Sequence, residues 1–256
     1  MKRNALVLWA TITCIFGLAY HNVAQAAELK VLTSVALTSV LDEIAPMFEK
    51  VTGTKLSINY DLIATQRKRI LEGESADVII LSRGVMDELQ KQTKLAASDL
   101  VNVAGTPVSV AARAGAPKPD ISTVDAFKQT LLNARSIVYA DPAKGGASGV
   151  YFARVLDRLG IAEQMKAKTI LVPGAQAAEV VAKGEAELGV AQGSEIVPIA
   201  GAQLVGPLPG EFASMTVFTA GIGAGSKALD SAKELLKFLT GPEAAVRFKA
   251  KGFEPG

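Results

Sequence analysis

The sequence predicts an α/β protein of two lobes, each a mostly parallel sheet flanked by helices. Apolar runs of strand length alternate with segments of helical spacing along almost the whole chain. Stretches rich in proline and glycine near 105–107 and 206–210 divide this alternation into two sets. We therefore expect lobe 1 to comprise 27–106 and 211–256, and lobe 2 to comprise 107–210. One continuous sheet fits the same alternation and remains an alternative.

Residues 1–26 have the pattern of a secretory signal peptide. Lys2 and Arg3 precede an apolar run from Ala5 to Ala19, and Ala24-Gln25-Ala26 places small residues at the cleavage positions. The run is shorter than the roughly 20 residues that a membrane-spanning helix needs. We expect an exported, soluble protein of the periplasm.

The composition excludes several classes of chemistry. The chain of 256 residues contains one cysteine, one histidine and one tryptophan, namely Cys14, His21 and Trp9, and all three lie in the predicted signal peptide. We therefore expect no disulfide, metal site or cofactor in the exported chain, and no cysteine or histidine nucleophile. Lys and Arg total 27 against 25 Asp and Glu, and this near balance argues against nucleic acid or an anionic membrane as a partner.

The first set of elements reads as three strands, each followed by a helix. Strands are expected at 29–34, 55–60 and 77–81, and helices at about 40–51, 64–72 and 84–92. Pro46 should kink or end the first helix.

The second set repeats the alternation after Pro107. Strands are expected at 108–113, 136–140, 168–172 and 187–191, and helices at 123–134, 149–159 and 176–183. Ser122 and Asp125 suggest a capping box for the first of these helices. A strand at 215–222 and two closing helices follow, and we expect these helices to return to lobe 1.

The segment "DPAKGGASGVY" places three glycines and a serine directly before a helix. Ser148 is a good N-cap, Gly149 allows close approach to the backbone, and a helix N-terminus favours negative charge. This combination indicates an anion site. The alternative is an ordinary capped loop, and the glycine spacing matches neither a phosphate loop nor a dinucleotide fingerprint.

Other strand-to-helix loops are rich in small, hydroxyl and amide residues, and two arginines stand out among them. Arg83 follows a buried strand, and Arg67 lies in the first turn of a helix. Either could anchor an acidic ligand by a bidentate bond, although a surface ion pair is the alternative. Tyr60, Asp61 and Tyr151 are candidate acids or bases if buried, with packing as their alternative role.

Several motifs together resemble the periplasmic molybdate-binding proteins, which are type II solute-binding proteins of ABC importers. They are "GESADV", "DPAKGGASGVY", "GEAELGVAQGSEI" and "FLTGPEAAVRFKAKGF", and the resemblance covers essentially the whole exported chain. It implies two lobes joined by two crossing segments, a ligand in the cleft between them, a monomer, and an inner-membrane permease as partner.

The resemblance carries over unevenly to the ligand residues. Ala36 and Ala64, the latter beside Thr65, stand where the family has serines, and Gln192 stands where it has a tyrosine. Ser148 falls where the family uses a backbone N–H, and Arg83 replaces a small residue. Loss of two hydroxyls and gain of an arginine favour a carboxylate ligand over molybdate.

The expected function is therefore capture of a small anion, with no catalytic residue. The expected ligand-binding residues come from both lobes: Ala36, Thr65, Ser82, Arg83, Ser148, Gly149, Gln176 and Gln192. The alternative is an enzyme, because one branch of similar proteins is the periplasmic aconitate isomerase. A 1,3-proton shift needs a base beside an acidic C–H, and Asp61, Tyr60 or Tyr151 would then supply it.

Overall fold

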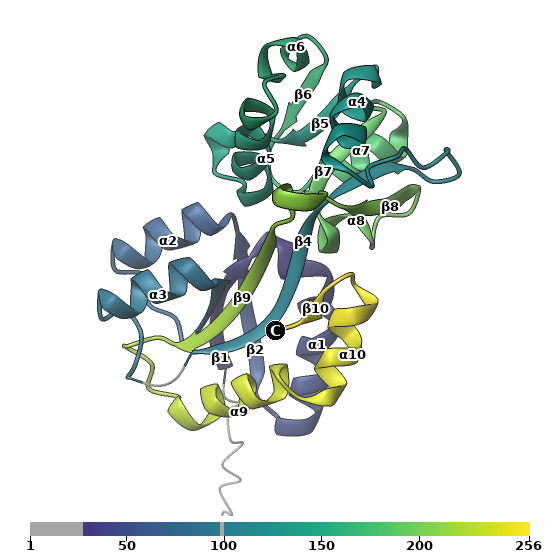
Figure 1. Ribbon diagram of the computed structural model, residues 1–256. Coiled ribbons are helices and arrows are strands. Elements are labelled where there is room, and N and C mark those ends of the chain that lie inside the picture. The colour runs from purple at the N-terminus through teal and green to yellow at the C-terminus, as the bar shows by residue number, and fades with distance from the viewer. Residues whose placement is uncertain (1–27, 98–99) are drawn as a thin grey trace, which may run out of the picture.

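The structure, a computed structural model, describes residues 28–97 and 100–256. The predicted signal peptide at 1–26 lies outside these residues. Two lobes are stacked one above the other; the long strand β4 (Val101–Arg113) runs from one into the other, and β9 (Met215–Ile222) lies beside the first half of β4 in the lower lobe (Figure 1). Within the described residues, none of the helices has the length and apolar character needed to span a membrane.

Lobe 1 is a sheet with the strand order β2-β1-β3-β9-β4, and helices cover both of its faces. The first three strands are parallel, and β9 is antiparallel to β3. Helices α1, α9 and α10 cover one face, and α2 and α3 cover the other. The elements are β1 (Glu28–Ser34), the 3₁₀ turn η1 (Val35–Leu37), α1 (Thr38–Thr52), β2 (Lys55–Asp61), α2 (Ile63–Leu71), β3 (Val78–Ser82), α3 (Arg83–Lys91), α9 (Leu229–Leu239), α10 (Pro242–Ala250) and β10 (Glu254–Pro255).

Lobe 2 is built on the second half of β4, which pairs with β7 and β8, while β5 and β6 extend the sheet beyond β7. Helices α4, α5 and α6 pack on one face, and α7 and α8 pack on the other. The elements are α4 (Val124–Asn133), β5 (Ile137–Ala140), η2 (Pro142–Lys144), α5 (Ala147–Arg158), α6 (Ala162–Lys166), β6 (Thr169–Val172), α7 (Ala177–Lys183), β7 (Leu188–Gln192), α8 (Gly193–Ile196), β8 (Ala202–Pro207) and η3 (Gly210–Phe212).

Strand β4 belongs to both lobes. Its first half, to Pro107, pairs with β9, and its second half, from Val108, pairs with β7. The expectation that this strand begins at Val108 is therefore wrong. Pro107 is the last β4 residue in register with β9. Proline has no backbone N–H to donate, and at the end of the paired segment this loss interrupts few of the hydrogen bonds between the strands. We propose the lobe boundaries at 106/107 and 210/211, supported by this change of partner. The strands of both lobes are linked by hydrogen bonds through β4, as in the alternative of one continuous sheet. The buried side chains nevertheless form separate clusters in each lobe.

Two other local expectations are corrected. Helix α1 does not end at Pro46 but continues to Thr52, whereas the alternative that the proline kinks the helix stays a prediction; the proline is exposed, so the carbonyl that loses its donor can face water. Helix α4 is capped by Thr123, whose Oγ1 accepts the Ala126 N–H at 3.1 Å, and not by Ser122. Elements α6 and β8 were not expected, because both are short and weakly patterned.

Candidate functional site

Two pockets are lined by residues of both lobes, at the ends of the strands that lead into helices. The η1–α8 pocket, of about 540 Å³, lies between the start of α1 and helices α7 and α8. The α3–α5 pocket, of about 340 Å³, lies between the starts of α3 and α5, beside β9. In open α/β sheets such crevices are the usual ligand positions.

The wall of the η1–α8 pocket carries polar groups without partners. Lobe 1 contributes Ala36 and Ser39, and lobe 2 contributes Gln176, Ser194 and Glu195. The hydroxyl oxygens of Ser39 and Ser194 are buried and form no hydrogen bond with any residue in the described part of the chain. Buried hydroxyls are normally hydrogen-bonded, so these two, one from each lobe, are the candidate donors to a guest in this pocket.

Glu195 has an unusual environment in the same pocket. It is the third residue of α8, and its Oε2 accepts the backbone N–H of Gln192 at 3.1 Å. Burial raises the pKa of Glu195 to about 7, opposed by that one hydrogen bond. The residue is partly buried in the wall of the pocket, and burial of a carboxyl group disfavours its charged form. Glu195 therefore changes charge near neutral pH.

Gln192 connects α8 to the crossing strands. Its side chain is 3% exposed, and its Nε2 donates to Thr216 Oγ1 of β9 at 2.8 Å. Its Oε1 faces the N–H of Glu195 in a capping arrangement but makes no hydrogen bond of normal geometry. Next along the chain, the Ser194 N–H donates to Thr106 Oγ1 of β4 at 3.0 Å. Helix α8 is thus fixed to both strands that pass between the lobes.

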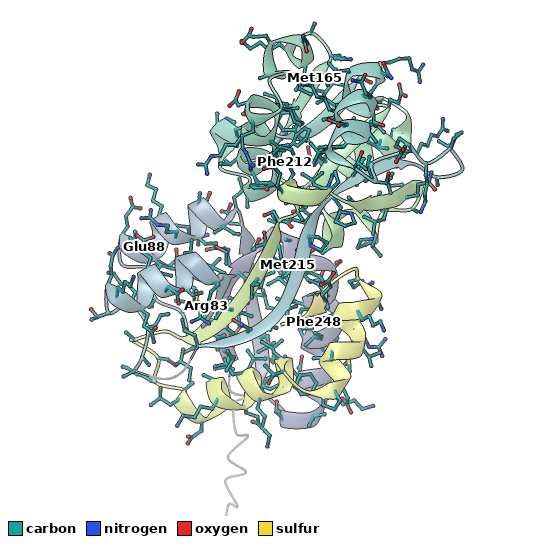
Figure 2. The ribbon with its side chains drawn as sticks, in the orientation of Figure 1. Arg83, Glu88, Met165, Phe212, Met215 and Phe248 are labelled. Carbon is teal, nitrogen blue, oxygen red and sulfur yellow. The ribbon has the colours of Figure 1, made fainter. Side chains whose placement is uncertain are left out.

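The α3–α5 pocket contains Ser82, Arg83 and Tyr151. Arg83 is the first residue of α3, in lobe 1 (Figure 2). Its guanidinium is half-exposed; Nε donates to Asp87 Oδ1 at 2.8 Å, and Nη1 lies 3.5 Å from Asn102 Oδ1. Both partners belong to lobe 1, and within residues 28–97 and 100–256 Arg83 has no ion pair across the cleft.

The glycines before α5 are explained by close packing. At Gly149 a Cβ would lie 1.9 Å from the Ala140 carbonyl oxygen, so α5 can sit on β5 only without a side chain there. At Gly145, where φ is +79°, a Cβ would lie 2.8 Å from the Cβ of Ala64 in α2. The lobes therefore approach each other closely at this point. The N-cap of α5 is Gly146, and Ser148 is its second residue, which corrects the expected cap.

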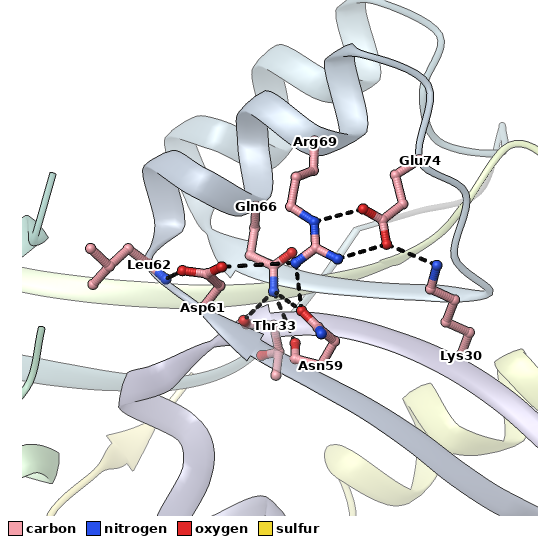
Figure 3. A network of polar contacts seen from close by, with 8 residues as sticks. All are labelled: Lys30, Thr33, Asn59, Asp61, Leu62, Gln66, Arg69 and Glu74. Carbon is pink, nitrogen blue, oxygen red and sulfur yellow. Dashed lines mark hydrogen bonds and ion pairs between the residues drawn. The ribbon is translucent and has the colours of Figure 1, made fainter. Parts of the chain in front are cut away.

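A polar network holds α2 against β1 and β2 (Figure 3). Gln66 is fully buried, and its Nε2 donates to Thr33 O at 3.1 Å and to Asn59 O at 2.9 Å. Arg69 lies 3.8 Å from an Asp61 carboxylate oxygen, and Asp61 Oδ1 accepts the Leu62 N–H at 2.7 Å.

The expected acid–base residues are thus engaged elsewhere. Besides Asp61 in this network, Tyr60 donates to Asp42 at 2.8 Å. Burial, followed by this carboxylate, raises the pKa of Tyr60 far above its usual range. Tyr151 donates to Phe212 O at 3.1 Å.

Arg67 is also committed to an internal contact. Its Nε donates to Glu88 Oε2 at 2.7 Å, in an ion pair between α2 and α3. Of the two roles expected for Arg67, this contact corresponds to the surface ion pair and not to the anchor for an acidic ligand.

The expected ligand residues divide between the two pockets. Ala36 and Gln176 line the first, and Ser82 and Arg83 line the second. Ser148, Gly149 and Gln192 lie at the adjoining helix starts, and Thr65 in the first turn of α2 lines neither pocket.

Sequence reasoning missed Ser39, Ser194 and Glu195. The spacing Gln192-Gly-Ser-Glu195 after a buried strand is a capping signature. That signal could have placed Glu195 at the mouth of a helix.

Comparison with known proteins gives three results. The family model described as bacterial extracellular solute-binding protein matches residues 29–254. An aconitate isomerase of Pseudomonas sp. is 35% identical over 233 residues, 89% of this chain and 87% of that protein. The molybdate-binding protein of Escherichia coli (strain K12) is 25% identical and covers 99% of both chains.

The likeness extends to three dimensions. The periplasmic molybdate-binding protein of Azotobacter vinelandii superposes with a TM-score of 0.72 at 22% identity, covering 89% of this chain and 99% of that one. The expected two-lobed α/β fold and the resemblance to molybdate-binding proteins are confirmed.

Proposed function

Because the chain belongs to the family of bacterial extracellular solute-binding proteins, we propose that it captures a small anion between its two lobes in the periplasm. The ligand-bound form, a monomer, would be presented to an ABC permease of the inner membrane. The eight ligand-binding residues expected from the sequence are retained as part of this proposal, together with Ser39 and Ser194.

The observation that carries the proposal is the η1–α8 pocket, with walls from both lobes. One unpartnered hydroxyl comes from each lobe, Ser39 from lobe 1 and Ser194 from lobe 2. A ligand favours lobe closure only through contacts that the open form lacks. A ligand that accepts hydrogen bonds from both hydroxyls would have that effect.

The ligand class proposed is an organic carboxylate. A compact tetrahedral oxyanion needs several short donors at close range, yet Ala36 lines the pocket where the resemblance expects a serine. Each of the two pockets takes polar groups from both lobes, which suits a ligand with more than one acidic group. Arg83, at the second pocket, is available to one of them by exchanging its half-exposed partner Asp87.

A second candidate function is isomerisation of a tricarboxylate. The supporting observation is the 35% identity to a protein named aconitate isomerase. A double-bond shift would require a proton acceptor in the cleft. Among the pocket residues described, Glu195 is the titratable group whose pKa is near neutrality.

A thermal-shift panel tests the proposal. Aconitate, citrate, succinate, molybdate and tungstate are each added to the purified exported chain. Ligand at 100 times its Kd should stabilise the protein by about 2.7 kcal/mol, and we expect this from a tricarboxylate and not from molybdate.

Each result has a defined meaning. A clear shift with molybdate would overturn the preferred ligand class, and no shift with any anion would overturn the proposal. Any tricarboxylate that binds is then incubated with the protein and followed by ultraviolet absorbance. Migration of the double bond would identify an enzyme, and unchanged absorbance would identify a receptor.

A further inference from the structure

The carboxyl group of Glu195 is held in one position at the wall of the η1–α8 pocket. One oxygen accepts the Gln192 N–H, and the other has no hydrogen-bond donor among the residues that the structure describes. The backbone bond at the start of α8 favours this position of the group over rotation away from the pocket. The free oxygen therefore contributes to the surface that the ligand meets.

No cation balances this carboxyl within the described lining of the pocket. Of the elements packed on α8, the strands β7 and β8 and the turn η1 carry no charged side chain. Arg113 ends β4 at the far side, beside Gly184. Lys251, near α8, is paired with Glu43 at 2.6 Å. The other charged residue in the lining is Glu179, an exposed carboxylate of α7.

An anion in this pocket would therefore meet a carboxylate of like charge. Two like charges at short range repel, and the repulsion grows as the entering ligand displaces water between them. A carboxyl group that titrates near neutral pH removes the repulsion by binding a proton at small cost, and in its neutral form it becomes a hydrogen-bond donor. Near neutral pH, protonation of Glu195 therefore costs less free energy than keeping its charge beside that of the anion.

We propose that Glu195 takes up one proton when the anion enters the η1–α8 pocket, and that the neutral carboxyl then donates a hydrogen bond to a ligand oxygen. This rests on the proposed function, since it requires an anion between the lobes. The proton comes from solvent, no covalent bond to the ligand forms, and the proton is released when the ligand leaves. The protein would bind its ligand more tightly at lower pH.

Titration calorimetry of the exported chain with aconitate tests this coupling. At pH 8, measurements in two buffers of different ionisation enthalpy should show uptake of close to one proton per ligand. From pH 6 to pH 9 the affinity should fall by about 100-fold, because each pH unit above the pKa costs a factor of ten.

The variant Glu195→Gln separates this effect from ionisation of the ligand itself. Its amide is an uncharged isostere that keeps the bond to Gln192. It should bind aconitate as tightly at pH 9 as at pH 7, and more tightly than the wild type at pH 9. Glu179→Gln, which changes the other carboxylate of the same lining, should retain the wild-type dependence.

The possible failures are distinguishable. If aconitate binds without proton uptake, or if Glu195→Gln keeps the pH dependence, this inference is wrong and the proposed function stands. If neither aconitate nor any other anion of the panel binds, the proposed function itself is wrong. Proton uptake by the wild type is measured without a variant, so a variant that does not fold leaves the test intact.

Discussion

Position 149 requires glycine for a steric reason, and the sequence shows this reason only indirectly. The residue lies in the first turn of α5, where its Cα approaches the carbonyl of Ala140 at the end of β5. Alanine has the higher helix propensity, by about 1 kcal/mol over glycine. A Cβ would lie 1.9 Å from that oxygen. The cost of this clash exceeds the gain in helix propensity, because the clashing atom belongs to the backbone and cannot move aside as a flexible side chain could.

We expect Gly149→Ala to lower the free energy of unfolding by about 1 to 3 kcal/mol, the usual cost of overpacking. Gly84, the second residue of α3, is the matched control, since a Cβ there meets nothing within 4 Å. Gly84→Ala should be neutral or stabilise by up to about 1 kcal/mol. Urea denaturation of both variants measures the difference. Equal effects of the two substitutions would refute the steric explanation.

At the scale of elements, Gln66 determines where α2 begins relative to the sheet. The amide is fully buried and donates to carbonyls of both β1 and β2, and to Asn59 Oδ1 at 3.1 Å. The start of α2 carries Leu62, which lines the η1–α8 pocket. A buried amide far from the ligand therefore positions part of the pocket wall.

Gln66→Leu should cost about 1 to 3 kcal/mol of stability, because the buried carbonyl of Thr33 loses this donor. The exposed Gln90 of α3 is the control, and Gln90→Leu should change stability by less than about 0.5 kcal/mol. Thermal unfolding compares the two. If Gln66→Leu were as harmless as the control, the amide would have no positioning role.

The alternation of elements was predictable because each buried strand and each amphipathic helix has its own hydrophobic period. Strand β9, expected at 215–222, is found at those residues. The start of β4 was missed because Gly105 and Pro107 read as a break, and only pairing with β9 makes the segment a strand. Local pattern cannot reveal such long-range pairing.

The pocket was predictable only in part, for a related reason. Strand-to-helix loops identified Ala36, Ser82, Arg83 and Gln176 as cleft residues, because the ends of parallel strands lie together. The pKa of Glu195 depends on burial by other segments, which no local pattern encodes. The ion pair between Arg67 and Glu88 could not be predicted either, because Glu88 belongs to another helix.

For the whole molecule, the close approach of Gly145 to Ala64 limits how the lobes meet. One belongs to the segment before α5 in lobe 2, and the other to α2 in lobe 1. Space for even one added carbon is lacking at Gly145. A larger side chain at position 64 would push against the Gly145 segment and keep the two lobes apart.

We expect Ala64→Leu to hold the lobes apart and to weaken aconitate binding at least tenfold, which corresponds to about 1.4 kcal/mol. Small-angle scattering should show a larger radius of gyration with ligand present than for the wild type. Lys68→Leu introduces the same side chain one turn further along α2, where the partner of Lys68 is Glu72 of the same lobe, and should leave both quantities unchanged. Unaltered affinity in Ala64→Leu would show that closure does not need this contact.

The pairing of β4 with β9 has a mechanical consequence. The two connections between the lobes are hydrogen-bonded to each other where they cross, since the Val108 N–H donates to Ser214 O at 2.9 Å and the Leu208 N–H donates to Val108 O at 3.1 Å, so they behave as a single ribbon and not as two independent tethers. Such a ribbon yields to bending and twisting about its own length and resists sideways translation. The lobes should accordingly swing along one preferred arc, which brings the same residues face to face at every cycle of uptake and release.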